Sequence, residues 1–333
     1  MTDHVPDPLA GFPALPEAEA ARGLMPNLFV IGASKSGSSA LHAYIRYHPE
    51  IRASEEKEPC FFVDQQELEE AWPIMARQPC SHQWPAYLDL YAGGEDKAYR
   101  AEGSVYYSQA PHRSQVAPRI AHFCPDAKIV YVVREPVSRA VGHYWQRFKE
   151  FQESLPIGEA MRSNAIYRDS SDYALQLREY QAHFPPEQIK VIVAEDLRTR
   201  RREVMSDLFG WLGIADLDYS EEQLAERHKS PSTTRTVRFP LVRALRDSAL
   251  WSSLRRVLPQ GWIETLRKAS TTTFEKSQVD ESGARDFLAR HLAPRRAEFE
   301  AMIGRHIEAW GPLAPQAAER ADEAPQATVP AAS

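Results

Sequence analysis

The sequence has few cysteines and no long apolar run. Only three of its 333 residues are cysteines, Cys60, Cys80 and Cys124, and no two of them form a CxxC pair. This scarcity argues against a disulfide framework or a zinc site and predicts reduced or buried thiols, so we expect a cytoplasmic protein. No apolar run approaches the roughly 18 residues of a membrane span, and the N-terminal residues show no pattern of a secretory signal.

A surplus of basic charge is also missing. The chain has 40 basic and 46 acidic residues, which gives a formal net charge of −6. This balance argues against nucleic acid as a partner of the whole surface, although a local basic pocket is compatible with it. The content of 43% hydrophobic and 26% charged residues is typical of a soluble globular protein.

The two ends differ in composition from the body of the chain. Residues 1–25 are rich in Pro, Ala and Glu and predict an extended N-terminal arm. Residues 313–333 lack the apolar content needed to pack, which predicts a disordered tail. We therefore expect one domain, over residues 26–312.

Strand and helix patterns alternate within this domain. Apolar or β-branched runs predict strands over 27–32, 98–104, 128–133 and 189–197. Helical patterns cover 38–48, 136–149, a stretch up to about 212, and 280–310, where an apolar stripe predicts core packing. Strands that alternate with helices imply a parallel sheet, so the fold class is α/β: a P-loop-like central parallel sheet with helices on both faces.

The segment FVIGASKSGSSAL (29–41) joins the first strand to the first helix. A Walker A loop has its lysine directly after the second glycine, whereas here Ser38 follows Gly37 and Lys35 lies inside the loop. The unpaired N–H groups and the dipole at a helix start favour an anion, and serine hydroxyls and a lysine add to this. We predict an anion site; the alternative is an ordinary polar turn.

A second candidate anion site follows the strand KIVYVV (128–133), which ends at Arg134. A kinase would need a carboxylate for Mg²⁺ near such a strand end. An arginine instead suits a second phosphate, although a surface ion pair with Glu135 or a nearby acid would also explain it. Two anion sites with no evident metal ligands indicate a doubly phosphorylated nucleotide that is bound without a metal.

These two segments together resemble the sulfotransferases that use 3′-phosphoadenosine-5′-phosphosulfate (PAPS), in particular the heparan-sulfate N- and 3-O-sulfotransferases and their bacterial relatives. The loop is similar to the family's 5′-phosphosulfate loop, and VVREPVSRAVGHY (132–144) is similar to its 3′-phosphate segment. The resemblance extends through EKEPCFF (56–62), AEGSVYY (101–107) and VIVAEDL (191–197). It implies PAPS as co-substrate, no metal, and release of adenosine 3′,5′-bisphosphate (PAP).

The resemblance also implies roles for individual residues. Lys35 would contact the 5′-phosphate and the bridging oxygen, and Arg134 the 3′-phosphate. Gly142 stands where the family usually has a serine, and Ser138 is a weak substitute for that hydroxyl. The basic segment 228–239 is a surface loop or a ligand lid, from which Arg235 would close over the 3′-phosphate. The rest of the phosphosulfate cradle would be Ser36, Gly37, Ser38 and Ser39.

Glu58, in EPCFF, matches the family's catalytic base. Its apolar neighbours Phe61 and Phe62 could raise a carboxylate pKa by desolvation. The alternative is a solvated acidic stretch in which Glu58 pairs with Lys57. A second departure from the family is Gly103, which stands where a lysine often follows the strand glutamate. Asp64 is a further candidate for a substrate contact.

The expected activity is one-step sulfuryl transfer to a hydroxyl or amine of a carbohydrate, lipid or other small acceptor. A P-loop small-molecule kinase and a nucleotide-binding module without catalysis are the alternatives. The aromatic residues of WPAYLDLY (84–91) either flank the acceptor or belong to the core of a helix. The histidines on the two helices, His42, His48 and His143, are predicted to be packing residues.

Overall fold

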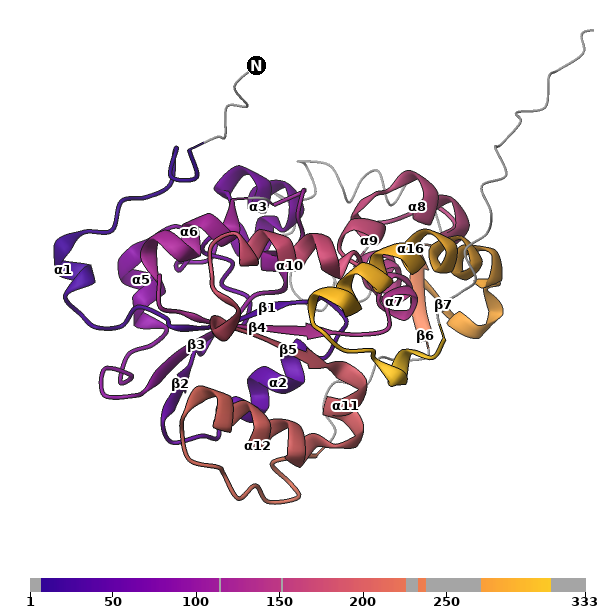
Figure 1. The fold of residues 1–333 in the computed structure, drawn as a ribbon. Helices are drawn as coiled ribbons and strands as arrows, with labels where there is room; N and C mark the ends of the chain where they lie inside the picture. Colours follow the sequence, from indigo (N-terminus) through magenta and orange to yellow (C-terminus); the bar gives the residue numbers. More distant parts are fainter. Residues whose placement is uncertain (1–6, 114, 151, 226–232, 238–270, 313–333) are drawn as a thin grey trace, which may run out of the picture.

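The computed structural model describes residues 7–113, 115–150, 152–225, 233–237 and 271–312. In this part of the chain five strands form one parallel sheet in the order β2-β3-β1-β4-β5 (Figure 1). The predicted P-loop-like α/β fold is confirmed. The strands are β1 Leu28–Gly32, β2 Ile51–Ala53, β3 Tyr99–Gly103, β4 Lys128–Val133 and β5 Ile189–Val193.

Helices cover both faces of the sheet (Figure 1). Because side chains alternate along a strand, Phe29 and Ile31 of β1 enter one core layer, while Leu28 and Val30 enter the other. This explains why the strands are apolar at successive positions. The first layer contains α3 Gln65–Ala71, α4 Pro73–Ala76, α5 Trp84–Asp89, α6 Val116–Phe123 and α10 Tyr173–Gln181; the second contains α2 Ser38–Ile45, α11 Ala194–Thr199 and α12 Arg201–Leu212.

A third apolar cluster lies beyond β4, in the chain that continues from this strand. Its helices are α7 Pro136–Lys149, α8 Ile157–Ser163, α9 Ile166–Asp169 and α16 Ser282–Met302. The antiparallel pair β6 Thr233–Val237 and β7 Thr271–Glu275 lies beside this cluster, with β6 next to α7 (Figure 1). The helices of the described residues include none that is long and apolar enough to cross a bilayer.

Three predicted boundaries are wrong. The helix predicted over 280–310 ends at Met302, and only a short 3-10 turn, Glu308–Trp310, follows it. The strand over 189–197 ends at Val193, and the next four residues begin α11. Glu195 and Asp196 favour this helix start because their charges complement the positive end of the helix dipole. The helix predicted over 38–48 ends earlier, at Ile45. This agrees with the sequence, because Pro49 disfavours helical backbone at the residue that precedes it.

The segment 228–239 is not simply a loop, since residues 233–237 form β6 and pair with β7. Threonine-rich sequences on both partners favour this pairing, because β-branched residues suit extended backbone. The remaining residues of that segment, and the predicted tail 313–333, lie outside the described residues.

The apolar stripe near the C-terminus packs in the core as predicted, with Phe299, Ile307 and Trp310 buried. The N-terminal arm contains the short helix α1 Glu17–Ala20, and its Phe12 packs against Phe61. The three cysteines are buried free thiols, in agreement with the prediction.

Candidate active site

The predicted phosphate loop leaves β1 at Gly32 and enters α2 at Ser38. Gly37 has φ 90°, a left-handed backbone conformation that glycine adopts without strain. The first turn of the helix is closed by Ala40 N–H, which donates to Gly37 O at 2.9 Å. The N–H groups of Gly37, Ser38 and Ser39 precede the helical hydrogen bonds and are therefore available to an anion, whereas Ser36 N–H donates to Ala33 O at 3.2 Å. The four cradle residues Ser36, Gly37, Ser38 and Ser39 all line one cleft.

Lys35 is half-buried in the same cleft. Its ammonium has no ion pair or hydrogen bond among the described residues. Burial lowers the pKa of Lys35, and the nearby cations Lys276 and Arg134 lower it further. A partly buried ammonium without a counterion would be stabilised by a bound anion.

Arg134 reaches the loop from the neighbouring strand β4. Its Nη1 donates to Lys35 O at 3.2 Å, and Tyr173 fixes its backbone through a 2.7 Å hydrogen bond from the phenol to Arg134 O. The alternative of an ion pair with Glu135 is wrong, because Glu135 caps α7 by accepting from two backbone N–H groups. In the described part of the chain Arg134 forms no ion pair and keeps its charge facing the cleft.

The cleft has a volume of about 590 Å³, within the range of small-molecule sites. It runs from Glu58 and Val105, past the phosphate loop, to α11 and the start of α12. Four cations and two carboxylates line it, so its charge favours an anionic ligand. These residues are Lys35, Arg134, Arg198 and Arg201, with Glu58 and Glu195.

Glu58 is held at one end of the cleft by backbone and charge. Its N–H donates to Gly103 O at 3.0 Å, and its Oε2 accepts from Val105 N–H at 2.6 Å. Lys57 contacts the other carboxylate oxygen. The Glu58 side chain is only 13% exposed, so it does not belong to a solvated acidic stretch, although the ion pair with Lys57 is present.

The two positions that depart from the family pattern are both packed against site residues. A Cβ on Gly142 would lie 3.4 Å from Lys35 Cβ, so this glycine faces the stem of the loop lysine. A Cβ on Gly103 would lie 2.9 Å from the ring of His42, which occupies the space that a larger side chain would need.

Other predicted residues divide between the cleft and the scaffold. Ser138, the weak candidate for the missing hydroxyl, does line the cleft. Asp64 caps α3, accepting from Gln66 N–H at 2.9 Å, and forms an ion pair with Arg119. Arg235 lies in β6, but its side chain lies outside the described part of the chain, so its role stays a prediction.

The histidines and aromatic residues are structural, as the core alternatives predicted. His42, His48 and His143 are buried, and burial lowers the pKa of His42 to about 3. Tyr87 and Tyr91 are fully buried and donate to the carboxylate of Glu102. Cys60 is also buried, and burial raises the pKa of its thiol.

Sequence reasoning missed the far end of the cleft. Arg201 lies 5.7 Å from the ring of Tyr44, and both line the cleft together with Arg198. The run of arginines after VIVAEDL was the available signal, but only the packing of α12 against α2 shows which arginine turns toward the phosphate loop.

A parallel α/β sheet with a phosphate loop and a cationic cleft at its carboxyl edge defines a nucleotide-binding class of protein. The sulfotransferase family matches residues 26–218, more than half of the chain, and the chain belongs to this family.

Curated relatives agree with this assignment. The chain is 28% identical over 199 residues to human heparan sulfate glucosamine 3-O-sulfotransferase 3B1, which covers 57% of this chain and 44% of the relative. It is 26% identical over 306 residues to human bifunctional heparan sulfate N-deacetylase/N-sulfotransferase 3, covering 86% of this chain and 31% of that protein. The chain therefore spans less than half the length of these relatives.

The fold is similar to that of a sulfotransferase from Alicyclobacillus acidocaldarius. The TM-score is 0.60 at 24% identity, over 86% of this chain and 98% of the other.

Proposed function

We propose that the chain transfers the sulfuryl group of PAPS to a hydroxyl or amine of a carbohydrate, lipid or other small acceptor and releases PAP. The observation that carries this proposal is the convergence of Lys35, Arg134 and Glu58 on one cleft. Lys35 and Arg134 form no ion pair within the described part of the chain, and their charges suit the two phosphate ends of the nucleotide. A carboxylate suits the proton of the acceptor. The unpaired buried thiols are compatible with a cytoplasmic location.

The residues fit the donor by their chemistry. Lys35 would neutralise the charge that grows on the leaving phosphate oxygen, and the serines and backbone N–H groups of the loop would hold the 5′-phosphosulfate. Arg134 would bind the 3′-phosphate, with Ser138 in the first turn of α7 as a hydroxyl donor. The bound donor would supply the sulfuryl group that is transferred.

Glu58 would accept the proton of the attacking hydroxyl or amine. Val105 N–H and Lys57 each engage one oxygen of its carboxylate, and every carboxylate oxygen retains a second lone pair for a proton. These contacts orient the base toward the loop without blocking it. We expect Glu58→Gln to keep PAP affinity and to lower kcat about 10²- to 10⁴-fold, the usual contribution of a general base.

Calorimetry tests the nucleotide assignment. We expect PAP to bind without a divalent metal, and Lys35→Met and Arg134→Met each to weaken it about tenfold or more, because each removes a charged hydrogen bond. The exposed Arg305 offers a control, Arg305→Gln. Preference for Mg·ATP over PAP would instead support the small-molecule kinase. Tight PAP binding with no transfer to any acceptor would support the non-catalytic binding module.

A further inference from the structure

Glu58 lies in an uncommon stretch of backbone. Glu58 has φ 66° and Cys60 has φ 53°, so two residues that are not glycine adopt the left-handed conformation within three positions. Such backbone is rare outside glycine and persists only where the surrounding structure holds it. We call residues 58–62 the base loop. The groups that hold this loop decide where the Glu58 carboxylate lies in the cleft.

Three consecutive residues at the end of β3 contact the base loop. Gly103 O accepts from Glu58 N–H at 3.0 Å, and Val105 N–H donates to the Glu58 carboxylate at 2.6 Å. Between them, Ser104 Oγ accepts from Cys60 N–H at 3.1 Å. Of the three residues, only Ser104 uses its side chain, so its contact is the one that depends on the residue type.

A buried carboxylate next to the loop orients the Ser104 hydroxyl. Ser104 Oγ donates to Glu102 Oε1 at 2.8 Å, and both residues are fully buried. Because the hydroxyl proton is donated to Glu102, an oxygen lone pair is left for Cys60 N–H. The Tyr107 hydroxyl repeats this arrangement, since it lies next to Glu102 and accepts from Phe62 N–H at 3.1 Å. The base loop is thus held at every second N–H group.

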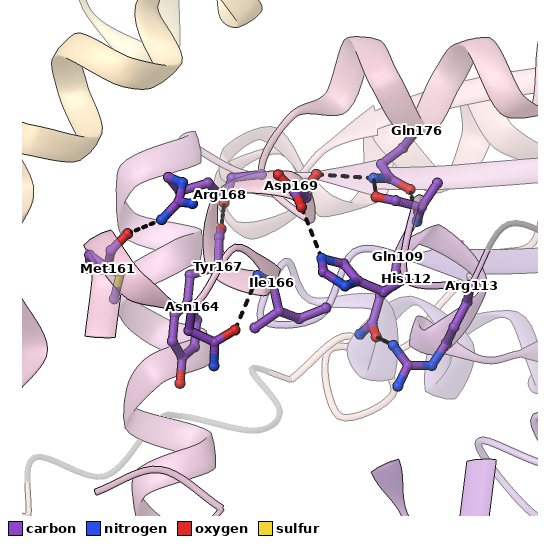
Figure 2. A network of polar contacts seen from close by, with 12 residues as sticks. Gln109, His112, Arg113, Met161, Asn164, Ile166, Tyr167, Arg168, Asp169 and Gln176 are labelled. Carbon is purple, nitrogen blue, oxygen red and sulfur yellow. Dashed lines mark hydrogen bonds and ion pairs between the residues drawn. The ribbon is translucent and has the colours of Figure 1, made fainter. Parts of the chain in front are cut away.

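The segment that carries Ser104 is itself fixed on both sides. Before it, β3 pairs with β1 in the sheet. After it, the side chain of Gln176 on α10 bonds both the N–H and the carbonyl of Ala110, at 2.8 and 2.7 Å. Figure 2 shows His112 reaching Asp169 on α9, with 2.9 Å between Nε2 and Oδ2. A residue on such a rigid scaffold can position another side chain precisely.

We propose that Ser104 is a positioning residue for Glu58: its hydroxyl, oriented by Glu102, holds the left-handed base loop so that the carboxylate faces the cleft. This inference rests on the proposed function, in which Glu58 takes the proton of the acceptor. Without the hydroxyl, Cys60 N–H would be buried without an acceptor and the loop would relax from its left-handed backbone. A displaced carboxylate would lower kcat, while the phosphate loop would still bind the nucleotide.

Amide hydrogen exchange tests the contact directly. In Ser104→Ala the Cys60 amide should exchange about tenfold faster, because its buried hydrogen bond is lost. Ser170 offers a matched control: it is a buried serine whose hydroxyl has no hydrogen-bond partner among the described residues. Ser170→Ala should leave the exchange of the Cys60 amide unchanged. Unchanged exchange of this amide in Ser104→Ala overturns the proposal.

Kinetics tests the positioning role, with PAP release from PAPS measured on n-octyl β-D-glucosaminide, which offers hydroxyls, an amine and an alkyl chain. Ser104→Ala should lower kcat about 10- to 100-fold and keep the KM for PAPS. Ser104→Thr retains the hydroxyl and should recover most of this loss. Because Ser104 acts through Glu58, adding Ser104→Ala to Glu58→Gln should lower kcat less than about twofold further. An equal fold loss in both backgrounds would show a general structural role and overturn the proposal.

Calorimetry with PAP separates this proposal from the proposed function. Ser104→Ala should bind PAP with the affinity of the wild type, and a weaker affinity would overturn the positioning role, because it would mean that the variant disturbs the phosphate loop. A wild-type protein that does not bind PAP overturns the proposed function, while the exchange of the Cys60 amide still decides whether Ser104 holds the base loop.

Discussion

Gly142 offers the sharpest test of the packing around the phosphate loop. It lies in the interior of α7, where glycine is less favourable than alanine by about 0.5–1 kcal/mol. A Cβ at this position would make an ordinary contact with Lys35, 3.4 Å from its Cβ. The added methyl group therefore has room, and alanine is a better helix former than glycine. Gly142→Ala should raise the free energy of unfolding by about 0.5–1 kcal/mol.

Gly103 is the matched control, since a methyl group there meets an occupied space. The added Cβ would lie 2.9 Å from His42 Cδ2, and His42 is only 4% exposed, so its ring has little room to move. Overpacking of this kind costs about 1–3 kcal/mol. Gly103→Ala should therefore destabilise the protein while Gly142→Ala stabilises it.

Urea denaturation of the ligand-free protein measures both effects through the midpoint at constant m-value. The same pair should separate in thermal unfolding, with Gly142→Ala raising Tm by about 1–2 °C. A loss of stability in Gly142→Ala would refute the reasoning, because it would mean that Lys35 cannot accommodate the methyl group. Unchanged stability in Gly103→Ala would equally refute the assigned packing of His42.

Two further predictions concern buried charges near the cleft. Burial lowers the pKa of Lys57 to about 8, so its ion pair with Glu58 is lost progressively as the pH rises through that value. We expect kcat/KM to fall above about pH 8. Lys57→Arg should move this fall to higher pH, because arginine stays protonated. A pH profile of kcat/KM that does not move in this variant would contradict the prediction. Arg139 is fully buried, forms no ion pair among the described residues and has an unpartnered Nη1. Arg139→Met should keep Tm without ligand but reduce the rise in Tm that PAP causes, measured by calorimetric scanning, and an undiminished rise would exclude an electrostatic role.

The local sequence was sufficient for the sheet and the phosphate loop. Continuous apolar runs such as 128–133 identify strands that are buried on both faces, and the loop between β1 and α2 carries its glycine and serines in sequence. The meeting of Lys35 and Arg134 also followed from the sequence, because the carboxyl ends of parallel strands share one edge.

The boundaries of helices and strands, and the contacts between residues far apart in the sequence, were harder to predict from the sequence. The end of β5 was misplaced because the apolar residues of VIVAEDL fit a strand and a helix start equally well. The assignment of Glu58 needed a resemblance, since nothing local distinguishes it from Glu55 and Glu56.

Tertiary structure alone decided which polar groups face one another. Val105 and Glu58 are 47 residues apart in sequence and meet through a 2.6 Å hydrogen bond. The sequence by itself determined the sheet and the phosphate loop, because these depend on local patterns. The base geometry and the acceptor end depend on contacts between distant segments, which no local pattern encodes.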